Sequence, residues 1–491
     1  MEFEIHRNSN PGDLVLDPFS GSGVVGLESI LAGRNFIGYD LNPLAICLSK
    51  STVKRNFNVE EFDAAIVNLK QDTKKRIMDL YKHGNSYVLY SVPGHGNKKD
   101  YNVVLCDYEF KKTGKDFIPN LDVRYGLDPQ QNIEVPDAAF PSSFYKDRFS
   151  YKGVSKVSDL FSTRALLALG ILRECILSMP KDVSEEFMMI LTNTLLHVTK
   201  LKSENIRPLG VNNYWIPDDF IEENVFWRFE DRAQQFKIAK MEIARRFREV
   251  RDQDTGNAVF WEKSSIPLVD IKDNSIDYIL TDPPYGDVIQ YSELSFVWNV
   301  WLGKNLDNSS ELIVNPVQSK NSEYFVSEFA VFLKDCFRVL KNRKLLTLCF
   351  QNKDPIIWFR IAKIAQSLGF RLNRIETFDF LGATFNKNWA TKSPKVDIYL
   401  TLTKENGFIQ SRKTPEILIF QDLIQMIHNQ ENSEALESVL DPYSRVIAMG
   451  IIEIFKGKDV KEFTKKEIEK FLIDANEEGV NSEKYNDLRL F

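Results

Sequence analysis

The hydrophobic and polar positions of the first fifty residues follow the order strand, helix, strand, helix. Apolar residues 14–16 indicate a buried strand, and residues 24–32 have the apolar spacing of a helix that Gly33 ends. Residues 35–39 form a second apolar run, and residues 44–53 return to helical spacing. This alternation predicts the start of an α/β fold.

Five further apolar runs lie beyond residue 256. They are residues 258–262, 276–281, 344–350, 372–380 and 396–403. Because strands interleaved with helices usually pair in parallel, the pattern predicts a seven-stranded, mostly parallel sheet. The gap between the second and third strands indicates that a large insertion splits the sheet.

The pattern divides the chain into four parts, which are residues 1–55, 56–255, 256–404 and 405–491. The insertion begins with a small β element over residues 86–122, with a basic tip at residues 111–115, and turns helical after Val157. The last part reads as helices, the clearest being residues 464–478, which start with a capping box from Thr464 to Glu467. We expect this part to cover the sheet, and a docking element is the alternative.

A glycine-rich turn follows the first strand, in the motif Asp17-Pro18-Phe19-Ser20-Gly21-Ser22-Gly23. Gly21 and Gly23 allow a tight turn and a close approach of backbone to a ligand, and the free N–H groups of the next helix would face that ligand. Asp40 ends the second strand, where a carboxylate can accept both hydroxyls of a ribose. The alternative is an ordinary strand-to-helix loop.

A second motif, Asp282-Pro283-Pro284-Tyr285, follows the strand at residues 276–281. By itself it could be a rigid turn at a strand end. Together with the glycine motif, it resembles the signature of methyltransferases that modify exocyclic amines of bases. A carboxylate at 282 and the carbonyl of Pro283 could accept the two amine hydrogens, which would aim the nitrogen lone pair at a methyl donor. Tyr285 would offer a ring for an extruded base.

Residues 157–168, 224–235 and 281–303 make the resemblance more specific, since they are similar to adenine-specific DNA methylases that contain a zinc ribbon. The similarity covers most of residues 12–404. It implies a class I (Rossmann-like) methyltransferase fold with an antiparallel last strand, and transfer of a methyl group from S-adenosylmethionine to N6 of adenine in DNA. The family's long segment before the cofactor motif and its zinc-ribbon cysteines are absent here.

The resemblance and the motifs together give a set of expected site residues. The catalytic residues would be Asp282, Pro283, Pro284 and Tyr285, and the cofactor residues would be Asp17, Pro18, Phe19, Gly21, Gly23, Asp40, Leu41, Asn42 and Ser264. Ser264 enters because the third strand is followed by Lys263-Ser264-Ser265, where many methyltransferases have a carboxylate near the cofactor's adenine. A hydroxyl or a backbone amide would have to replace that contact.

Aromatic and basic side chains offer additional candidates. Tyr291, Phe296, Trp298 and Trp301 could stack on bases, but their spacing is also that of a helix packed on the sheet, and we expect Trp298 and Trp301 to be core. Trp389, in the basic loop at residues 386–389, could approach substrate. A helix at residues 231–250 could contact phosphates or form a solvated face through Lys237, Lys240, Arg245, Arg246, Arg248 and Arg251.

Composition narrows these possibilities only slightly. The net charge is −6, so a DNA-binding surface must be a local basic patch. The five cysteines are widely spaced without a C-x-x-C pair, which disfavours disulfides and zinc, and we expect no metal. No apolar run is long enough for a membrane span, and we expect a cytoplasmic protein.

Three other functions remain open from the sequence. An N4-cytosine methyltransferase would share the mechanism, but would more typically have Ser at position 282. The other two functions are those of an RNA guanine-N2 methyltransferase and of a catalytically idle DNA-recognition subunit. Residues 1–13 leave no room for the helix that usually closes one side of the cofactor pocket, so we expect a second protein chain to cover that edge. The other expected partner is DNA, with the target base flipped into the site.

Overall fold

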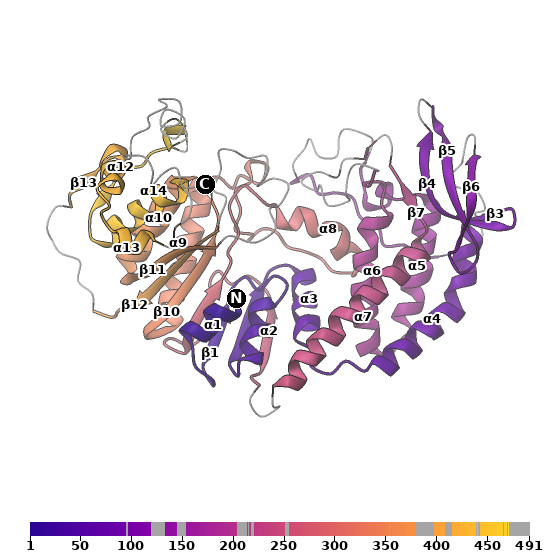
Figure 1. The fold of residues 1–491 in the computed structure, drawn as a ribbon, viewed down its shortest axis with the longest axis horizontal. Helices are drawn as coiled ribbons and strands as arrows, with labels where there is room; N and C mark the ends of the chain where they lie inside the picture. The colour runs from indigo at the N-terminus through magenta and orange to yellow at the C-terminus, as the bar shows by residue number, and fades with distance from the viewer. Residues whose placement is uncertain are drawn as a thin grey trace. The chain divides into compact units, whose positions relative to one another are not determined.

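The structure is a computed structural model that forms two compact units. It describes residues 1–94, 97–118, 133–144, 154–203, 214, 216–217, 220–250, 255–352, 354–378, 397–407, 415–437, 439, 442–464, 466–468 and 470. The first unit comprises Met1–Leu41, Gln253–Ile289 and Ser309–Phe491, and the second comprises Asn42–Asp252 and Gln290–Asn308 (Figure 1). The chain therefore leaves the first unit after β2 and returns to it just before β8.

A seven-stranded sheet organises the first unit. Its strands are β1 (Leu14–Asp17), β2 (Asn35–Asp40), β8 (Ala258–Glu262), β9 (Ile276–Thr281), β10 (Leu340–Phe350), β11 (Phe370–Phe378) and β12 (Asp397–Lys404). They lie in the order β11-β12-β10-β9-β1-β2-β8. All pairs are parallel except those that β12 makes with β10 and β11. The strands expected from the apolar runs are present, β10 begins four residues early, and the last strand is antiparallel, as the resemblance implied.

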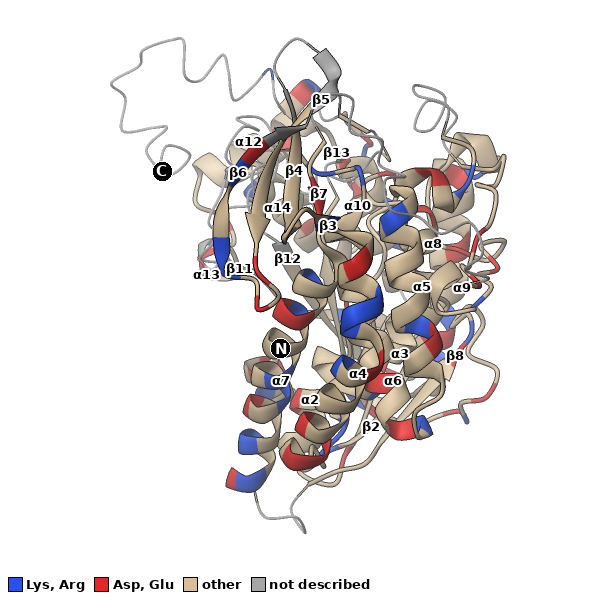
Figure 2. Ribbon diagram, turned by 90° about the vertical axis from the view of Figure 1, so that its right-hand side faces the viewer, with Lys and Arg blue, Asp and Glu red and all other residues tan. Residues whose placement is uncertain are grey.

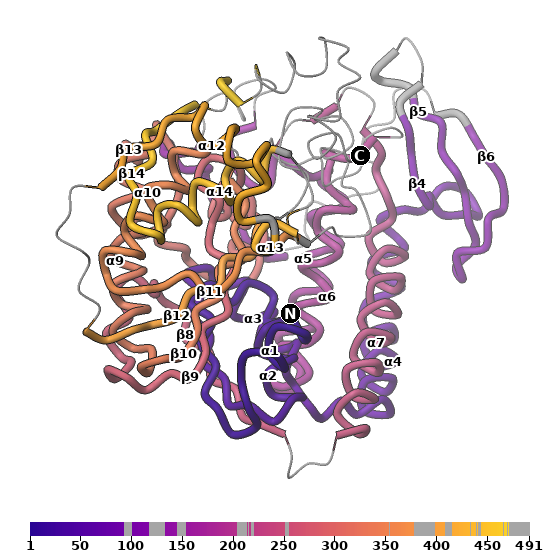
Figure 3. The backbone as a smooth tube through the Cα atoms, turned by 60° about the vertical axis from the view of Figure 1, so that its left-hand side comes forward, coloured from indigo at the N-terminus to yellow at the C-terminus, as the bar shows by residue number. Residues whose placement is uncertain are grey.

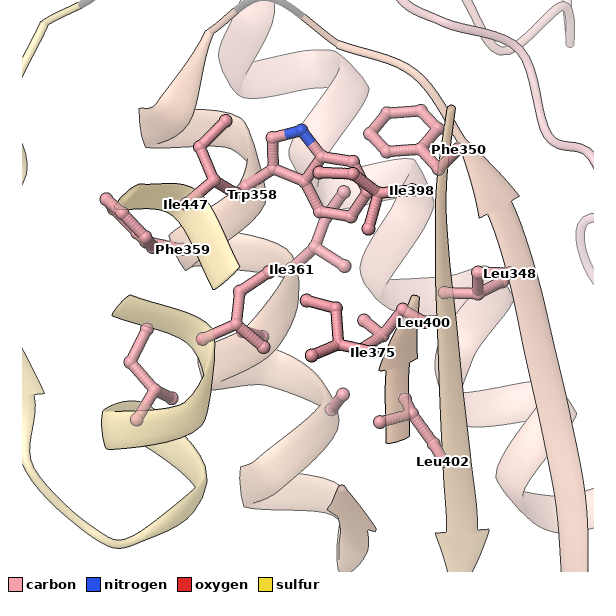
Figure 4. Packing of buried hydrophobic residues seen from close by; sticks show 14 of the residues in the cluster. Leu348, Phe350, Trp358, Phe359, Ile361, Ile375, Ile398, Leu400, Leu402 and Ile447 are labelled. Carbon is pink, nitrogen blue, oxygen red and sulfur yellow. The ribbon is translucent and has the colours of Figure 1, made fainter. Parts of the chain in front are cut away.

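Helices and two short strands complete the first unit. They are α1 (Glu2–Asn8), α2 (Val24–Leu31), α9 (Ser322–Val339), α10 (Pro355–Leu368), α12 (Phe420–His428), α13 (Ser433–Leu436), α14 (Pro442–Phe455), β13 (Ile417–Leu418) and β14 (Asp459–Val460). Figure 4 shows Trp358 of α10 between the strand residue Phe350 and Ile447 of α14. The C-terminal helices thus share the core of the sheet, which confirms their expected role as its cover.

The capping box expected near residue 464 is present. The Thr464 hydroxyl donates to Glu467 Oε2 at 2.9 Å, and Phe463 and Ile468 on either side are buried. Most of the helix expected over residues 464–478 lies outside the described residues, as does the loop with Trp389. No helix of the described chain is long and apolar enough to cross a membrane.

Residues 1–13 contain the helix α1, so the expectation that no helix fits there is wrong. Ile5 is fully buried, and the Asn8 amide donates to the Tyr278 hydroxyl of β9 at 2.9 Å. Arg374 of β11 donates to Glu4 at 2.5 Å. Seven residues suffice for a helix here because its stability comes from these contacts and not from its length. The second protein chain was expected because this helix was thought to be missing. It stays a prediction, but that reason for it no longer holds.

The second unit combines long helices with a small sheet. Its elements are α3 (Pro43–Val53), α4 (Val59–Leu80), β3 (Lys82–His83), β4 (Ser86–Gly94), β5 (Asn97–Cys106), β6 (Lys112–Ile118), α5 (Thr163–Leu177), α6 (Lys181–Leu195), β7 (Glu222–Glu223), α7 (Val225–Glu249) and α8 (Tyr291–Trp301). Helices α4, α5, α6 and α7 lie side by side around one apolar core (Figure 3). The small sheet has the order β3-β4-β5-β6, and β7 pairs with β4.

Some expectations for the second unit are wrong. Helix α7 begins at Val225, six residues before the expected start at Asp231, because Asn224 caps it. The Asn224 side chain accepts from the N–H groups of Phe226 and Trp227, a strong start signal that the sequence analysis passed over. Residues 111–115 do not form a tip, because residues 112–115 lie in β6.

Candidate functional site

The strand order of the first unit changes direction between β1 and β9. From β1 the chain proceeds to β2 and β8 on one side, and it later adds β9 and β10 on the other. In open parallel sheets, ligands bind outside the carboxyl ends of the strands at such a switch point. The glycine motif follows β1 and the Asp282 motif follows β9. The fold therefore brings together two motifs that are far apart in the sequence.

The glycine turn is fastened to the end of β2. Gly21 and Gly23 have φ values of +52° and +79°, in the left-handed region where glycine is favoured. The N–H of Ser20 donates to the Tyr39 carbonyl at 2.8 Å, and the N–H of Gly21 donates to Asp40 Oδ2 at 2.9 Å. The conformational reason for both glycines is thus confirmed, and Asp40 lies beside the turn as expected.

Asp17 is the buried carboxylate of the site. It is 2% exposed, and its Oδ1 accepts from the Thr281 hydroxyl at 2.7 Å and from the Phe19 N–H at 3.0 Å. Burial, with smaller contributions from the negative charges of Asp282 and Asp40, raises the pKa of Asp17 to about 7 against the lowering effect of the two hydrogen bonds. The site therefore carries an excess of negative charge that a cation would relieve.

The turn Asp282-Pro283-Pro284-Tyr285 begins directly after β9. Asp282 is exposed, Pro283 is buried, and Pro284 and Tyr285 are half-buried. The ring of Tyr285 meets Phe350 of β10 edge-on, with 6.0 Å between the ring centroids. One edge of the tyrosine is therefore held by the core while the Asp282 carboxylate reaches the surface of the unit.

Asn352, which the sequence analysis did not single out, holds this turn from the neighbouring strand. Its Nδ2 donates to the Tyr285 carbonyl at 3.1 Å, and its Oδ1 accepts from the Asp354 N–H at 2.7 Å. Its own carbonyl accepts from Trp358 Nε1 at 3.0 Å, and the residue is only 3% exposed. Its position just past the end of a strand in the same sheet is the signal that could have identified it.

Three of the other expected cofactor residues are near the turn but are partly covered. Pro18 is buried, and Phe19 and Leu41 are half-buried. The Phe19 ring packs edge-on against Phe332 at 5.2 Å between centroids. Phe19 is therefore anchored in the core of the first unit, which keeps the glycine turn in place.

Asn42 belongs to the second unit, where it caps a helix. Its Oδ1 accepts from the Leu44 N–H at 3.1 Å and from Asn299 Nδ2 at 3.0 Å. Both bonds use the side-chain oxygen, so Asn42 already has a structural task at the start of α3.

Ser264 also has local partners. Its hydroxyl donates to the Ile266 carbonyl and accepts from the Ile266 N–H, both at 3.1 Å. A different side chain occupies the end of the third strand: Glu262 is exposed and lies opposite Asp40 in the register of β8 and β2. Glu262 was missed because the contact with the cofactor's adenine was expected after the end of the strand and not at its last residue.

The aromatic residues 291–301 form helix α8, which packs in the second unit and not on the sheet. Trp301 is fully buried, and Trp298 Nε1 donates to the Thr192 carbonyl at 2.9 Å. Phe296 packs on Phe140 at 5.4 Å between centroids. The core assignment of the two tryptophans is confirmed, but the expected packing surface is wrong because the apolar face of α8 meets aromatic rings of the second unit. Tyr291 is 36% exposed.

The basic residues of α7 are largely neutralised. Lys237 pairs with Asp63 at 2.7 Å, Arg245 pairs with Glu242 at 2.6 Å, and Lys240 is 2% exposed with its ammonium on the Ser51 carbonyl. Arg251 lies outside the described residues. These pairs favour a solvated structural face over a phosphate-binding one.

No group of three or more His, Cys, Asp or Glu side chains within the described ranges is placed to hold a metal ion. The absence of metal stays a prediction.

Comparison with known proteins gives matches to DNA methyltransferases. Residues 1–51 match the model of the family described as DNA methylase. The chain is 43% identical over 59 residues to DNA adenine methyltransferase YhdJ of Escherichia coli (strain K12), which is 12% of this chain and 20% of that protein. It is 44% identical over 62 residues to the type II methyltransferase M.XycI of Xanthomonas campestris pv. cyanopsidis, 12% of this chain and 21% of that protein.

A longer and weaker match spans a larger part of the chain. The chain is 21% identical over 305 residues to the type II methyltransferase M.MvaI of Kocuria varians, which is 60% of this chain and 52% of that protein. The chain thus spans about a fifth to about half of the lengths of these curated relatives. Its first 51 residues, which hold the glycine motif, are therefore similar to the DNA methylase family, and its homologues are type II DNA methyltransferases.

Proposed function

We propose that this protein transfers a methyl group from S-adenosylmethionine to an exocyclic amine of a DNA base, and that the base is adenine with N6 as the acceptor. The observation that carries the proposal is the meeting of the glycine turn, Asp40 and the Asp282 motif at the switch point of one sheet. The sheet has the mostly parallel order and the antiparallel last strand of a class I methyltransferase.

The chemistry of the site fits this cofactor. S-adenosylmethionine supplies an electrophilic methyl on a cationic sulfonium and carries a second positive charge on its amino group. Burial is the main cause of the raised pKa of Asp17, and the negative charges of Asp282 and Asp40 add to it; the two cationic groups of the cofactor would offset this negative charge. Asp40 would accept from the ribose hydroxyls, and Glu262 opposite it would reach toward the adenine side.

The chain's own residues would perform the transfer step by positioning. Asp282 and the Pro283 carbonyl would accept the hydrogens of the target amine, which localises the nitrogen lone pair and stabilises the positive charge that develops on nitrogen. Tyr285 would stack on the flipped base, with its ring orientation fixed by Phe350. Asn352 would hold the Tyr285 carbonyl, so that the turn keeps its shape during the reaction.

The choice of adenine rests on two observations. Position 282 is Asp, where an N4-cytosine enzyme would more typically have Ser. One of the relatives, YhdJ, is named as a DNA adenine methyltransferase, whereas the names of M.XycI and M.MvaI do not state the base. N4-cytosine is the second candidate, and analysis of the methylated nucleosides from treated DNA distinguishes the two.

The test compares two aspartate variants of the full chain. Asp282→Ala should bind S-adenosylmethionine like the wild type but lose methylation of duplex DNA, since its partner is the target amine. Asp40→Ala should weaken cofactor binding by about 1–3 kcal/mol, because it removes a charged acceptor. Calorimetry measures the binding and mass spectrometry of nucleosides measures the methylation.

Methylation by Asp282→Ala at a rate near that of the wild type would refute the proposed mechanism. Unchanged cofactor affinity in Asp40→Ala would refute the cofactor assignment. A wild-type chain that binds the cofactor and never methylates DNA would be the idle recognition subunit.

A further inference from the structure

We infer that the small sheet of the second unit is a docking surface for the phosphate backbone of duplex DNA. Lys82, Lys111, Lys112 and Lys115, here called the lysine surface, would make the contacts. This inference rests on the proposed function, since it names the part of the chain that would hold the DNA substrate of that reaction.

The strand register places three of these lysines on one face, and Lys111 directly precedes Lys112. Lys82 of β3 lies opposite Tyr87, Tyr87 lies opposite Cys106, and Cys106 lies opposite Lys112 of β6, so the two lysines end one row across the sheet. Directly opposed residues of antiparallel strands share a face. Lys115 is opposite Val104, two residues before Cys106, and therefore shares this face too.

Two side-chain contacts draw β6 toward the β3–β4 turn. His83 Nε2 lies 2.9 Å from Asp116 Oδ2, and the Ser86 and Thr113 hydroxyls are 3.3 Å apart. The sheet therefore curls, which brings the lysines at its two ends closer together. Figure 2 shows blue positions on the ribbon of β6.

The four ammonium groups of the lysine surface are exposed and, within the described part of the chain, have no ion-pair or hydrogen-bond partner. Neighbouring lysines differ: Lys75 pairs with Asp79 at 2.7 Å and Lys74 pairs with Glu109 at 3.1 Å. Unpaired lysines grouped together repel one another, and phosphates would relieve that repulsion.

The lysine surface stands on a rigid base. Val104 and Cys106, which share a face with Lys115 and Lys112, are buried in one cluster with Leu89, and Tyr87 meets Tyr108 with 5.9 Å between ring centroids. The ammonium of Lys74 lies 4.5 Å from the centroid of the Tyr108 ring. A fixed base limits the entropy that the lysines lose when they contact a regular array of phosphates.

Duplex DNA is the occupant that the charge favours. The chain has a net charge of −6, so a cluster of unpaired lysines needs a partner that is more negative than the rest of the protein. The helix α7, the other basic segment of this unit, has already paired most of its charges internally. The lysine surface, and not α7, therefore supplies the local patch that a DNA methyltransferase of this net charge requires.

The test measures binding of a labelled duplex to the full chain at several salt concentrations. The variant K82A/K111A/K112A/K115A should bind about 10- to 100-fold more weakly at low salt, and the slope of log K against log salt should fall by about 3–4, near 0.9 per lost phosphate contact. The control K70A/R232A/K237A/R245A removes four positive charges of the same unit that are paired with Glu230, Asp231, Asp63 and Glu242. Its slope should match that of the wild type.

Equal salt slopes for the two variants would overturn the inference, as would the absence of salt-dependent duplex binding by the wild type. A shift of the melting temperature by S-adenosylmethionine, equal in both variants, shows that each is folded. The proposed function fails separately, if the wild type binds duplex DNA through the lysine surface but transfers no methyl group to it.

Discussion

Asn352 shows how one side chain outside both motifs can fix the geometry of the candidate site. Asn352→Ala removes the donor to the Tyr285 carbonyl and the acceptor for the Asp354 N–H. Because a small displacement of a reacting group is costly, we expect kcat for DNA methylation to fall about 10- to 100-fold with little change in cofactor affinity. Steady-state kinetics and calorimetry on the same preparation measure the two quantities.

Asn321→Ala is the matched control for this variant. Asn321 caps α9 by accepting from the Tyr324 N–H at 2.9 Å, so its loss costs about 1 kcal/mol of stability and leaves the turn intact. If both variants lose the same stability and both keep kcat, Asn352 does not position the turn.

Asp17 gives the site a dependence on pH. Its pKa is raised to about 7, so the folded protein gains stability from the neutral carboxyl below about pH 4 and loses that contribution as pH rises through about 7. A cationic cofactor should bind more tightly once Asp17 ionises. We therefore expect affinity for S-adenosylmethionine to rise between about pH 6 and 8. Calorimetry across this range measures it.

Asp17→Asn keeps an oxygen for the Thr281 hydroxyl and the Phe19 N–H but cannot ionise. The amino group of the cofactor also titrates, but its effect on affinity is the same for Asp17→Asn and for the wild type, so the comparison isolates the effect of Asp17. A pH profile of affinity that is the same in Asp17→Asn and in the wild type would assign the dependence to other groups.

At the scale of elements, α1 depends on one arginine. The Arg374 guanidinium donates to Glu4, which is 2% exposed, and to Asn8 Oδ1 at 3.1 Å. Arg374→Ala would leave the Glu4 carboxylate buried with much of its neutralising charge removed. We expect a loss of about 2–4 kcal/mol in the free energy of unfolding of the first unit, with faster amide exchange in α1.

Arg371 is the control on the same strand. It pairs with Glu405, but both side chains are well exposed, so Arg371→Ala should cost less than about 1 kcal/mol. Urea unfolding and hydrogen exchange compare the two variants. Equal losses would mean that the buried pair does not anchor α1.

The elements also show which sequence signals succeed. The strands of the sheet were predicted because each is a short apolar run, and the antiparallel β12 came from the family resemblance. Helix α1 was missed because its apolar residues are few and its stability comes from Tyr278 and Arg374, which are far away in the sequence. The predicted start of helix α7 lay too far along the chain because Asn224 was not recognised as its cap.

At the scale of the whole molecule, the amino-acid sequence predicted both motifs and the fold class, but it did not predict how the chain divides into two compact units. Helix α8 follows the Asp282 motif closely, yet it packs with Phe140 and Tyr214 of the second unit, and only tertiary contacts decide that. The same holds for Asn352 and Glu262, whose importance appears only when neighbouring strands are paired. Local patterns predict elements, whereas the partners of a surface depend on the complete fold.

The pairing of β1 with β9 also sets the order in which the protein can assemble during synthesis. Val15 of β1 pairs with Tyr278 of β9, and Phe36 of β2 pairs with Ala258 of β8. While the chain between β2 and β8 is being made, β1 and β2 can therefore pair only with each other. The second unit is almost completely synthesised by then and can fold first, since domains generally fold as units. On the ribosome, the glycine turn must therefore wait for Thr281 to emerge before Asp17 gains its hydroxyl partner. A nascent chain stalled before Ala258 would already carry the complete DNA methylase family match, but its first sheet would still be an unfinished two-stranded fragment.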